Sequence, residues 1–124
     1  LHLSIRRQRQ MCIRDRHQDG VNLKPLLNGQ GELPERSLYW HYPHYNSHPS
    51  SVPSSVIRRG DWKLIQTFDP VGLELYNLKD DIGESRNLAI QRPGLVKELL
   101  AELDVWRLSV GAEQMRPNPD YEMK

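Results

Sequence analysis

Apolar and polar side chains alternate with a period of two in four short stretches of the chain. These stretches are residues 37–42, 55–59, 61–67 and 73–78. Gly60 lies between the second and the third stretch, in a turn that contains Gly60-Asp61, and Asp69-Pro70 precedes the fourth. Glycine and proline thus stand where tight turns are needed. The pattern predicts four short β-strands in a small antiparallel sheet.

A period of three to four residues replaces this alternation near the end of the chain. Its apolar positions form one stripe, made of Leu95, Leu99, Leu103, Trp106 and Val110. Pro93 suits the first turn of a helix, where its missing N–H costs nothing, and Gly111 suits the end. Glu98 and Glu102 lie off the stripe and are expected on the solvated face. The pattern predicts an amphipathic helix over residues 93–110.

The remaining segments are rich in Gly, Pro and polar residues and predict turns and loops. A helical turn is expected over residues 22–28, closed by Gly29, with a long loop over residues 44–54. Four polar residues around Gly83 lack the spacing of a calcium-binding loop and predict a turn with a capping network; they are Asp80, Asp81, Glu84 and Asn87.

Together these elements predict an α+β fold, with the small antiparallel β-sheet packed against one C-terminal amphipathic helix. A single helix cannot cover both faces of a sheet. The other face is therefore expected to pack on a part of the protein upstream.

Residues 1–16 differ from the rest of the chain in charge. They contain five arginines and a single acidic residue, Asp15. The run RRQRQMCIRDR (residues 6–16) resembles the translation of a transposase adapter used in sequencing libraries, in register over its whole length. We therefore exclude residues 1–16 from the fold as an adapter-derived, disordered segment. Residues 17–124 are assigned to one subdomain that is expected to be truncated at its start.

This exclusion changes what the composition says about function. The 124 residues carry 17 Lys and Arg against 16 Asp and Glu, a net charge of +1. Without residues 1–16 these counts become 12 and 15, a net charge of −3, and Cys12, the only cysteine, is lost as well. A nucleic-acid-binding arm, a disulfide framework and a four-cysteine zinc site are therefore not expected. No apolar run is long enough for a membrane span.

Histidines and aromatic residues near the first strand carry the candidate chemistry. His41, His44 and His48 have the wrong spacing for one helix face, and no carboxylate lies between them to complete a metal site. The alternatives are loop histidines that stack on tyrosines, or residues that line a substrate site. Three aromatic side chains beside them could present flat faces to a sugar or could anchor the loop: Trp40, Tyr42 and Tyr45. No catalytic constellation can be assembled from the chain.

Five segments, in order, resemble the C-terminal region of type I sulfatases, with the pattern of arylsulfatases and N-sulfoglucosamine sulfohydrolases. They are DGVNLKPLLNG (residues 19–29), RSLYWHYPHY (36–45), SSVIRRGDWKLIQ (54–66), LELYNLKDDIGESRNLA (73–89) and the helix that contains the Leu and Trp stripe. The departures from the family pattern are mild: Asn22 replaces a small hydroxyl residue, and Val56 replaces an alanine.

The resemblance implies that the parent protein hydrolyses sulfate esters or sulfamates of carbohydrates. The family uses a formylglycine, made from C/S-x-P-x-R, and an adjacent Ca²⁺, and these groups lie upstream of the region that the chain resembles. The serine–proline runs over residues 47–55 lack the arginine of that motif. The chain alone is therefore expected to be inactive, to bind neither cofactor, and to pack on its missing N-terminal catalytic domain.

By the same resemblance, His41, His44 and Tyr45 are the expected substrate-binding residues, and the chain is expected to hold no catalytic or metal-binding residue. The family is often secreted or periplasmic, so the same location is expected here. The alternative function is a free-standing carbohydrate-binding module without catalysis.

Overall fold

The computed structural model describes residues 20–45, 48 and 51–115, which fall into two compact units. The described part of the first unit, Leu1–Pro34, contains the short helix α2 (Lys24–Leu27). Gly29 follows its end with a φ of 66°, a left-handed conformation that glycine adopts without strain. The predicted helical turn is confirmed. Residues 1–16, set apart as adapter-derived and disordered, lie outside the described residues.

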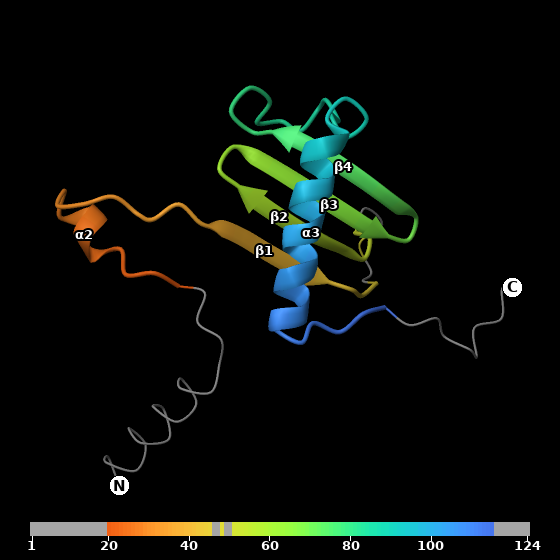
Figure 1. Ribbon diagram of the computed structural model, residues 1–124, viewed down its shortest axis with the longest axis horizontal. Helices are drawn as coiled ribbons and strands as arrows, with labels where there is room; N and C mark the ends of the chain where they lie inside the picture. The colour runs from red at the N-terminus through yellow and green to blue at the C-terminus, as the bar shows by residue number, and fades with distance from the viewer. Residues whose placement is uncertain (1–19, 46–47, 49–50, 116–124) are drawn as a thin grey trace, which may run out of the picture. The chain divides into compact units, whose positions relative to one another are not determined.

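The described part of the second unit, Glu35–Lys124, contains an antiparallel sheet and a long helix. Its elements are β1 (Ser37–Tyr42), β2 (Ser54–Arg59), β3 (Trp62–Phe68), β4 (Val71–Asn77) and α3 (Pro93–Ser109). The strand order follows the chain, and α3 lies across one face of the sheet (Figure 1). The predicted α+β fold is confirmed. The last strand begins two residues earlier than predicted, because Val71 already pairs with Phe68.

The hydrophobic core lies between α3 and the sheet. Every second residue of each strand faces the helix, and the register aligns these residues in rows across the sheet. The central row consists of Tyr39, Ile57, Leu64 and Leu75. Its three aliphatic members are fully buried against Leu99 and Leu103 of the helix. Each such side chain contributes about 1.5–3 kcal/mol when it is buried. Most of the predicted stripe therefore forms the helical half of the core, where Val96 joins it; Val110 lies beyond the end of α3 and outside this core.

A polar junction at Glu102 ties α3 to the sheet. Its carboxylate accepts hydrogen bonds from the hydroxyls of Ser37 and Tyr39 (2.8 Å from Tyr39) and from the Arg59 guanidinium (3.0 Å). The prediction that Glu102 lies on the solvated face is wrong, because the helix passes directly over these three donors. Glu98 also pairs with Arg59, at 2.8 Å, but its side chain is 61% exposed, against 31% for Glu102.

These contacts determine the protonation of the junction. Burial alone would raise the pKa of Glu102, but the hydrogen bonds from Ser37 and Tyr39 and the charge of Arg59 together hold it below its ordinary value. Burial and the hydrogen bond to Glu102 raise the pKa of Tyr39. Around neutral pH the Glu102 carboxylate therefore stays ionised as the acceptor, and the Tyr39 phenol stays neutral as the donor.

The opposite face of the sheet has no helix over it in the described part of the chain. Its middle row consists of Trp40, Val56, Ile65 and Glu74. Trp40 is 52% exposed, and Tyr42 in the neighbouring row is 46% exposed. Near β4 this face is more closed, since Tyr76 is only 8% exposed; this burial and a hydrogen bond to Glu74 raise the pKa of Tyr76 to about 12. The sheet is thus covered on one side and carries exposed aromatic rings on the other.

The turn after β4 contains the predicted capping network. Asp81 accepts hydrogen bonds from the backbone amides of Ser85 and Arg86, and these bonds lower its pKa. The side chain of Asn87 accepts from the amide of Leu75 and so binds the outer edge of β4. The polar residues around Gly83 therefore stabilise a turn.

Replacing Glu102 with Gln is expected to lower the free energy of unfolding by about 1–3 kcal/mol, because donors that are partly buried lose a charged acceptor. Glu98→Gln is the matched control on the same helix, and its exposed ion pair predicts a loss below about 1 kcal/mol. Urea unfolding of both variants at pH 7 measures the difference. Equal losses in the two variants would contradict the role assigned to Glu102.

The stabilising effect of Glu102 is also expected to depend on pH. Because its folded pKa is lowered, the carboxylate stabilises the fold above its unfolded pKa of about 4.5, and this contribution is lost as the pH falls through the folded pKa. The difference in unfolding free energy between the wild-type chain and Glu102→Gln should therefore shrink below about pH 4.5. A difference that stays constant from pH 7 to pH 3 would be inconsistent with this assignment.

Candidate functional site

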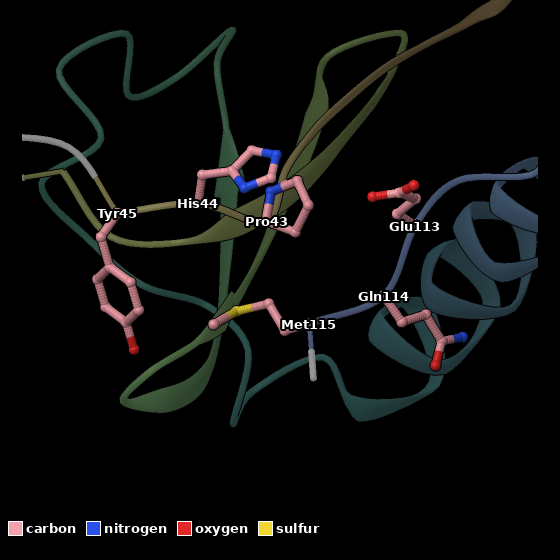
Figure 2. Close-up of a pocket in the computed structure, with 6 residues that line it drawn as sticks. All are labelled: Pro43, His44, Tyr45, Glu113, Gln114 and Met115. Carbon is pink, nitrogen blue, oxygen red and sulfur yellow. The ribbon is translucent and has the colours of Figure 1, made fainter. Parts of the chain in front are cut away.

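A pocket opens between the segment that follows β1 and the segment that follows α3. It has a volume of about 590 Å³ and is lined by Pro43, His44, Tyr45, Glu113, Gln114 and Met115. Figure 2 shows these side chains coming from the two separate segments, residues 43–45 and residues 113–115. The volume is within the usual range for small-molecule sites, about 300–1,000 Å³. Two of the three predicted substrate-binding residues, His44 and Tyr45, therefore line one pocket.

Tyr45 supplies an aromatic face to this pocket. Its side chain is 62% exposed, and its hydroxyl donates a hydrogen bond to the carboxylate of Asp69, in the turn between β3 and β4. The bond restricts the orientation of the ring while leaving much of its surface accessible. A fixed ring with a polar rim is suited to contact with the face of a sugar.

The charges of the lining residues are sparse and mixed. His44 is exposed and packs edge-on against the ring of Tyr42, with ring centroids 5.5 Å apart. Of the six lining residues, His44 alone can carry a positive charge, whereas Glu113 can carry a negative one. The described walls therefore suit the uncharged part of a carbohydrate better than a sulfate group.

His41 lies beside the pocket, under α3, and does not line it. Its Nδ1 is 2.6 Å from the hydroxyl oxygen of Ser55, its partner on β2, and its Nε2 is 2.5 Å from the carbonyl oxygen of Glu113. Both ring nitrogens are thus engaged within the chain. A direct contact between His41 and substrate stays a prediction.

The pairing of Ser55 with His41 resembles an activated nucleophile, but its surroundings do not permit that chemistry. Ser55 is fully buried and lies too deep for a substrate to reach. Arg107 of α3 also points to its hydroxyl, at 3.4 Å, and is itself bound to Asp104 and stacked over the ring of Phe68. The group is a buried polar network and not a catalytic one.

Sequence reasoning missed most of this network. Ser55 is 14 positions from His41, Arg107 is 52 positions from Ser55, and Glu113 is 72 positions from His41. The alternation of the strands places His41 and Ser55 on one face only once the register is known. Glu113 contributes a backbone carbonyl, which carries no signal in the sequence.

Within residues 20–45, 48 and 51–115, no group of three His, Cys, Asp or Glu side chains is close enough to hold a metal ion. His48 is exposed and does not join His44 in lining the pocket. The same residues include no helix with the length and apolarity needed to cross a bilayer.

Comparison with known proteins connects this fold to sulfatases. No protein-family model matches the chain. A curated sulfatase of Formosa agariphila is 33% identical over 82 residues, which cover 60% of this chain and 15% of that protein. An N-acetylglucosamine-6-O-sulfatase of Bacteroides thetaiotaomicron is 33% identical over 73 residues, which cover 56% of this chain and 13% of that protein. The chain thus spans no more than about a seventh of the length of these relatives.

Solved structures agree with these similarities. A protein in complex with its substrate, D-glucosamine-2-N,6-O-disulfate, matches with a TM-score of 0.62 and 28% identity, over 78% of this chain and 21% of that chain. A 2-O GAG sulfatase matches with a TM-score of 0.55 and 27% identity, over 76% of this chain and 21% of that chain. In both sequence and fold, the chain therefore matches the C-terminal region of the sulfatase family.

Proposed function

We propose that the chain is the C-terminal subdomain of a longer sulfatase, which hydrolyses sulfate esters or sulfamates of carbohydrates. The observation that carries this proposal is the agreement between sequence and fold: the curated relatives are sulfatases, and the solved structures that match include a complex with a disulfated glucosamine. Hydrolysis is assigned to the rest of the protein, and the chain by itself is expected to be inactive.

The reaction groups of the family do not fit the residues described for this chain. The acidic residues gathered around Gly83 are engaged in a turn, where Asp81 binds backbone amides, and no three potential metal ligands meet among the described residues. The sequence also lacks C/S-x-P-x-R, from which formylglycine is made. We therefore place both Ca²⁺ and formylglycine in the remainder of the protein, and no step of the reaction is assigned to this chain.

The contribution of the chain itself is contact with the sugar. Tyr45 provides a ring held by Asp69, and His44 provides one ring N–H donor and one ring nitrogen acceptor for the hydroxyl groups of a sugar. His41 supports the same pocket from behind through Glu113. The near absence of positive charge among the lining residues supports a contact of this pocket with the sugar ring, with the sulfate group bound by the catalytic domain.

The partner proposed for the uncovered face of the sheet is the catalytic domain of the same protein. Trp40 and Tyr42 expose about half of their surfaces there, beside the half-buried Val56 and Ile65. Burial of such a face against another domain would remove apolar surface from water. A secreted or periplasmic location follows for the whole protein by analogy with its family.

A free-standing carbohydrate-binding module is not favoured. Such a module would combine Trp40, Tyr42 and Tyr45 in one platform, but only Tyr45 lines the pocket. Trp40 and Tyr42 belong to strand positions that face away from α3. The curated relatives are named as sulfatases, and this chain corresponds to a small part of each of them.

The first test is release of sulfate by the complete gene product. Extension of the reading frame upstream is expected to reveal C/S-x-P-x-R, and the complete protein, made in a host that forms formylglycine, is expected to release sulfate from N- or O-sulfated glucosamine. Ion chromatography measures the product. The matched controls are the 124-residue chain and the complete protein with the motif Cys or Ser replaced by Ala, both without activity. A complete reading frame that lacks the motif and releases no sulfate would refute the proposal.

The second test concerns Tyr45. In the complete protein, Tyr45→Ala is expected to raise KM for the sulfated sugar by about 5–30-fold, which corresponds to the loss of about 1–2 kcal/mol of ring contact. Tyr45→Phe is the matched control, because it keeps the ring in the pocket and removes only the hydroxyl that binds Asp69. Steady-state kinetics of both variants give the comparison. Equal KM values for the two variants would exclude a substrate contact at Tyr45.

A further inference from the structure

The two walls of the pocket belong to segments that are distant in the sequence. Residues 43–45 follow the edge strand β1, and residues 113–115 follow the end of α3. The bond between His41 Nε2 and the Glu113 carbonyl, at 2.5 Å, joins the base of one wall to the base of the other. The spacing of the walls therefore depends on where this ring is held.

The ring of His41 is itself held by a buried partner. A carbonyl oxygen can only accept, so Nε2 must carry the hydrogen in this bond, and in the neutral ring Nδ1 is left to accept the hydroxyl hydrogen of Ser55. Ser55 is fully buried, so its hydroxyl does not exchange partners with water. The ring also lies edge-on to Phe68, with centroids 5.9 Å apart. Three contacts thus leave His41 one orientation.

The network continues into the helix. Arg107 donates toward the Ser55 oxygen at 3.4 Å, and it is anchored by Asp104, three residues earlier on α3. Its side chain is 13% exposed and lies over the ring of Phe68. A change in the seating of α3 on the sheet would therefore reach Glu113 by two routes, through the chain that follows the helix and through the side chain of His41.

We infer that His41 is a positioning residue, which fixes residues 113–115 opposite residues 43–45 and so sets the width of the pocket. Substrate contact then falls to His44 and Tyr45, and His41 acts through Glu113. The inference rests on the proposed function only where it predicts an effect of His41 on the affinity for sugar. The ordering of residues 113–115 by His41 is a property of this chain alone.

Two substitutions of His41 separate its two bonds. Gln places an amide nitrogen near the position of Nε2 and can still donate to the Glu113 carbonyl, whereas Asn reaches only the position of Nδ1 and keeps the bond to Ser55. In the 124-residue chain, backbone ¹⁵N order parameters of residues 113–115 are expected to fall from about 0.8 to below about 0.6 in His41→Asn and to stay near the wild-type value in His41→Gln. Circular dichroism establishes that each variant is folded.

Ser55→Ala is the second variant, because it keeps the imidazole and removes only the group that orients it. It is expected to lower the same order parameters by an intermediate amount, while the long-range ¹H–¹⁵N spectrum of the wild-type chain shows His41 as the Nε2–H tautomer. Unchanged order parameters in both His41→Asn and Ser55→Ala would overturn the positioning role.

Kinetics of the complete protein distinguish this inference from the proposed function. His41→Asn is expected to raise KM by about threefold or more with kcat little changed, and His41→Gln is expected to restore KM. Loss of order without any change in KM would support the positioning role and would instead refute the pocket as a substrate site. Equal KM increases in His41→Asn and His41→Gln would overturn the assignment to the Nε2 bond.

Discussion

A single helix has to shield the whole apolar face of a four-stranded sheet, and most features of the molecule follow from how it does so. The central row of the sheet meets Leu99 and Leu103, so the helix axis must pass over Ile57 and Leu64. Because the apolar stripe of α3 packs on this row, the helix residues on either side of the stripe also lie close to the surface of the sheet. Polar side chains at those flanks must then find partners there or remain without hydrogen bonds.

Glu102 and Arg107 are the two less exposed flanking side chains that find such partners, whereas Glu98, which also pairs with Arg59, is 61% exposed. Glu102 meets Ser37 and Tyr39 on the edge strand, and Tyr39 also stacks on Trp106 with ring centroids 4.8 Å apart. Arg107, further along the helix, meets Ser55. Apolar burial supplies most of the free energy of this contact, whereas the polar bonds are directional and select one seating of the helix among those that would bury similar area. The seating of the helix also positions the pocket, since one wall follows the end of β1 and the other follows the end of α3.

The sequence predicts the elements well because their signals are local. Alternation in β1 to β4, the spacing of the leucines in α3 and the glycines at positions 60 and 111 each act within a few residues. The polar partners could not be predicted in the same way. Glu102 has the position of a solvated helix residue, and only the crossing of helix and edge strand, set by contacts 63 to 65 positions apart, converts it into a junction.

The two walls of the pocket also differ in how far the sequence predicts them. His44 and Tyr45 stand out in the sequence because a cluster of rings follows a strand and precedes a loop. The opposite wall, residues 113–115, has no comparable signal, since its composition is that of an ordinary polar segment after a helix. The sequence predicts that His41 contacts substrate, and this stays a prediction; the sequence shows the imidazole but not the Glu113 carbonyl oxygen that lies against its Nε2.

The uncovered sheet face and the scarcity of positive charge in the pocket both support the proposal that the chain belongs to a longer protein. A domain that functioned alone on sulfated sugars would need cationic donors in its own pocket, because a sulfate group is bound chiefly through charge-assisted hydrogen bonds. Here Arg59 is engaged with the carboxylates of α3, and Arg107 is engaged with Asp104 and Ser55. Under the proposed function, a subdomain that contributes a sugar-contacting pocket can leave the sulfate group to the catalytic domain and can leave one sheet face open to pack on that domain. On this proposal, Trp40 and Tyr42 are exposed in this chain because they face the catalytic domain, and not because they form a second sugar site.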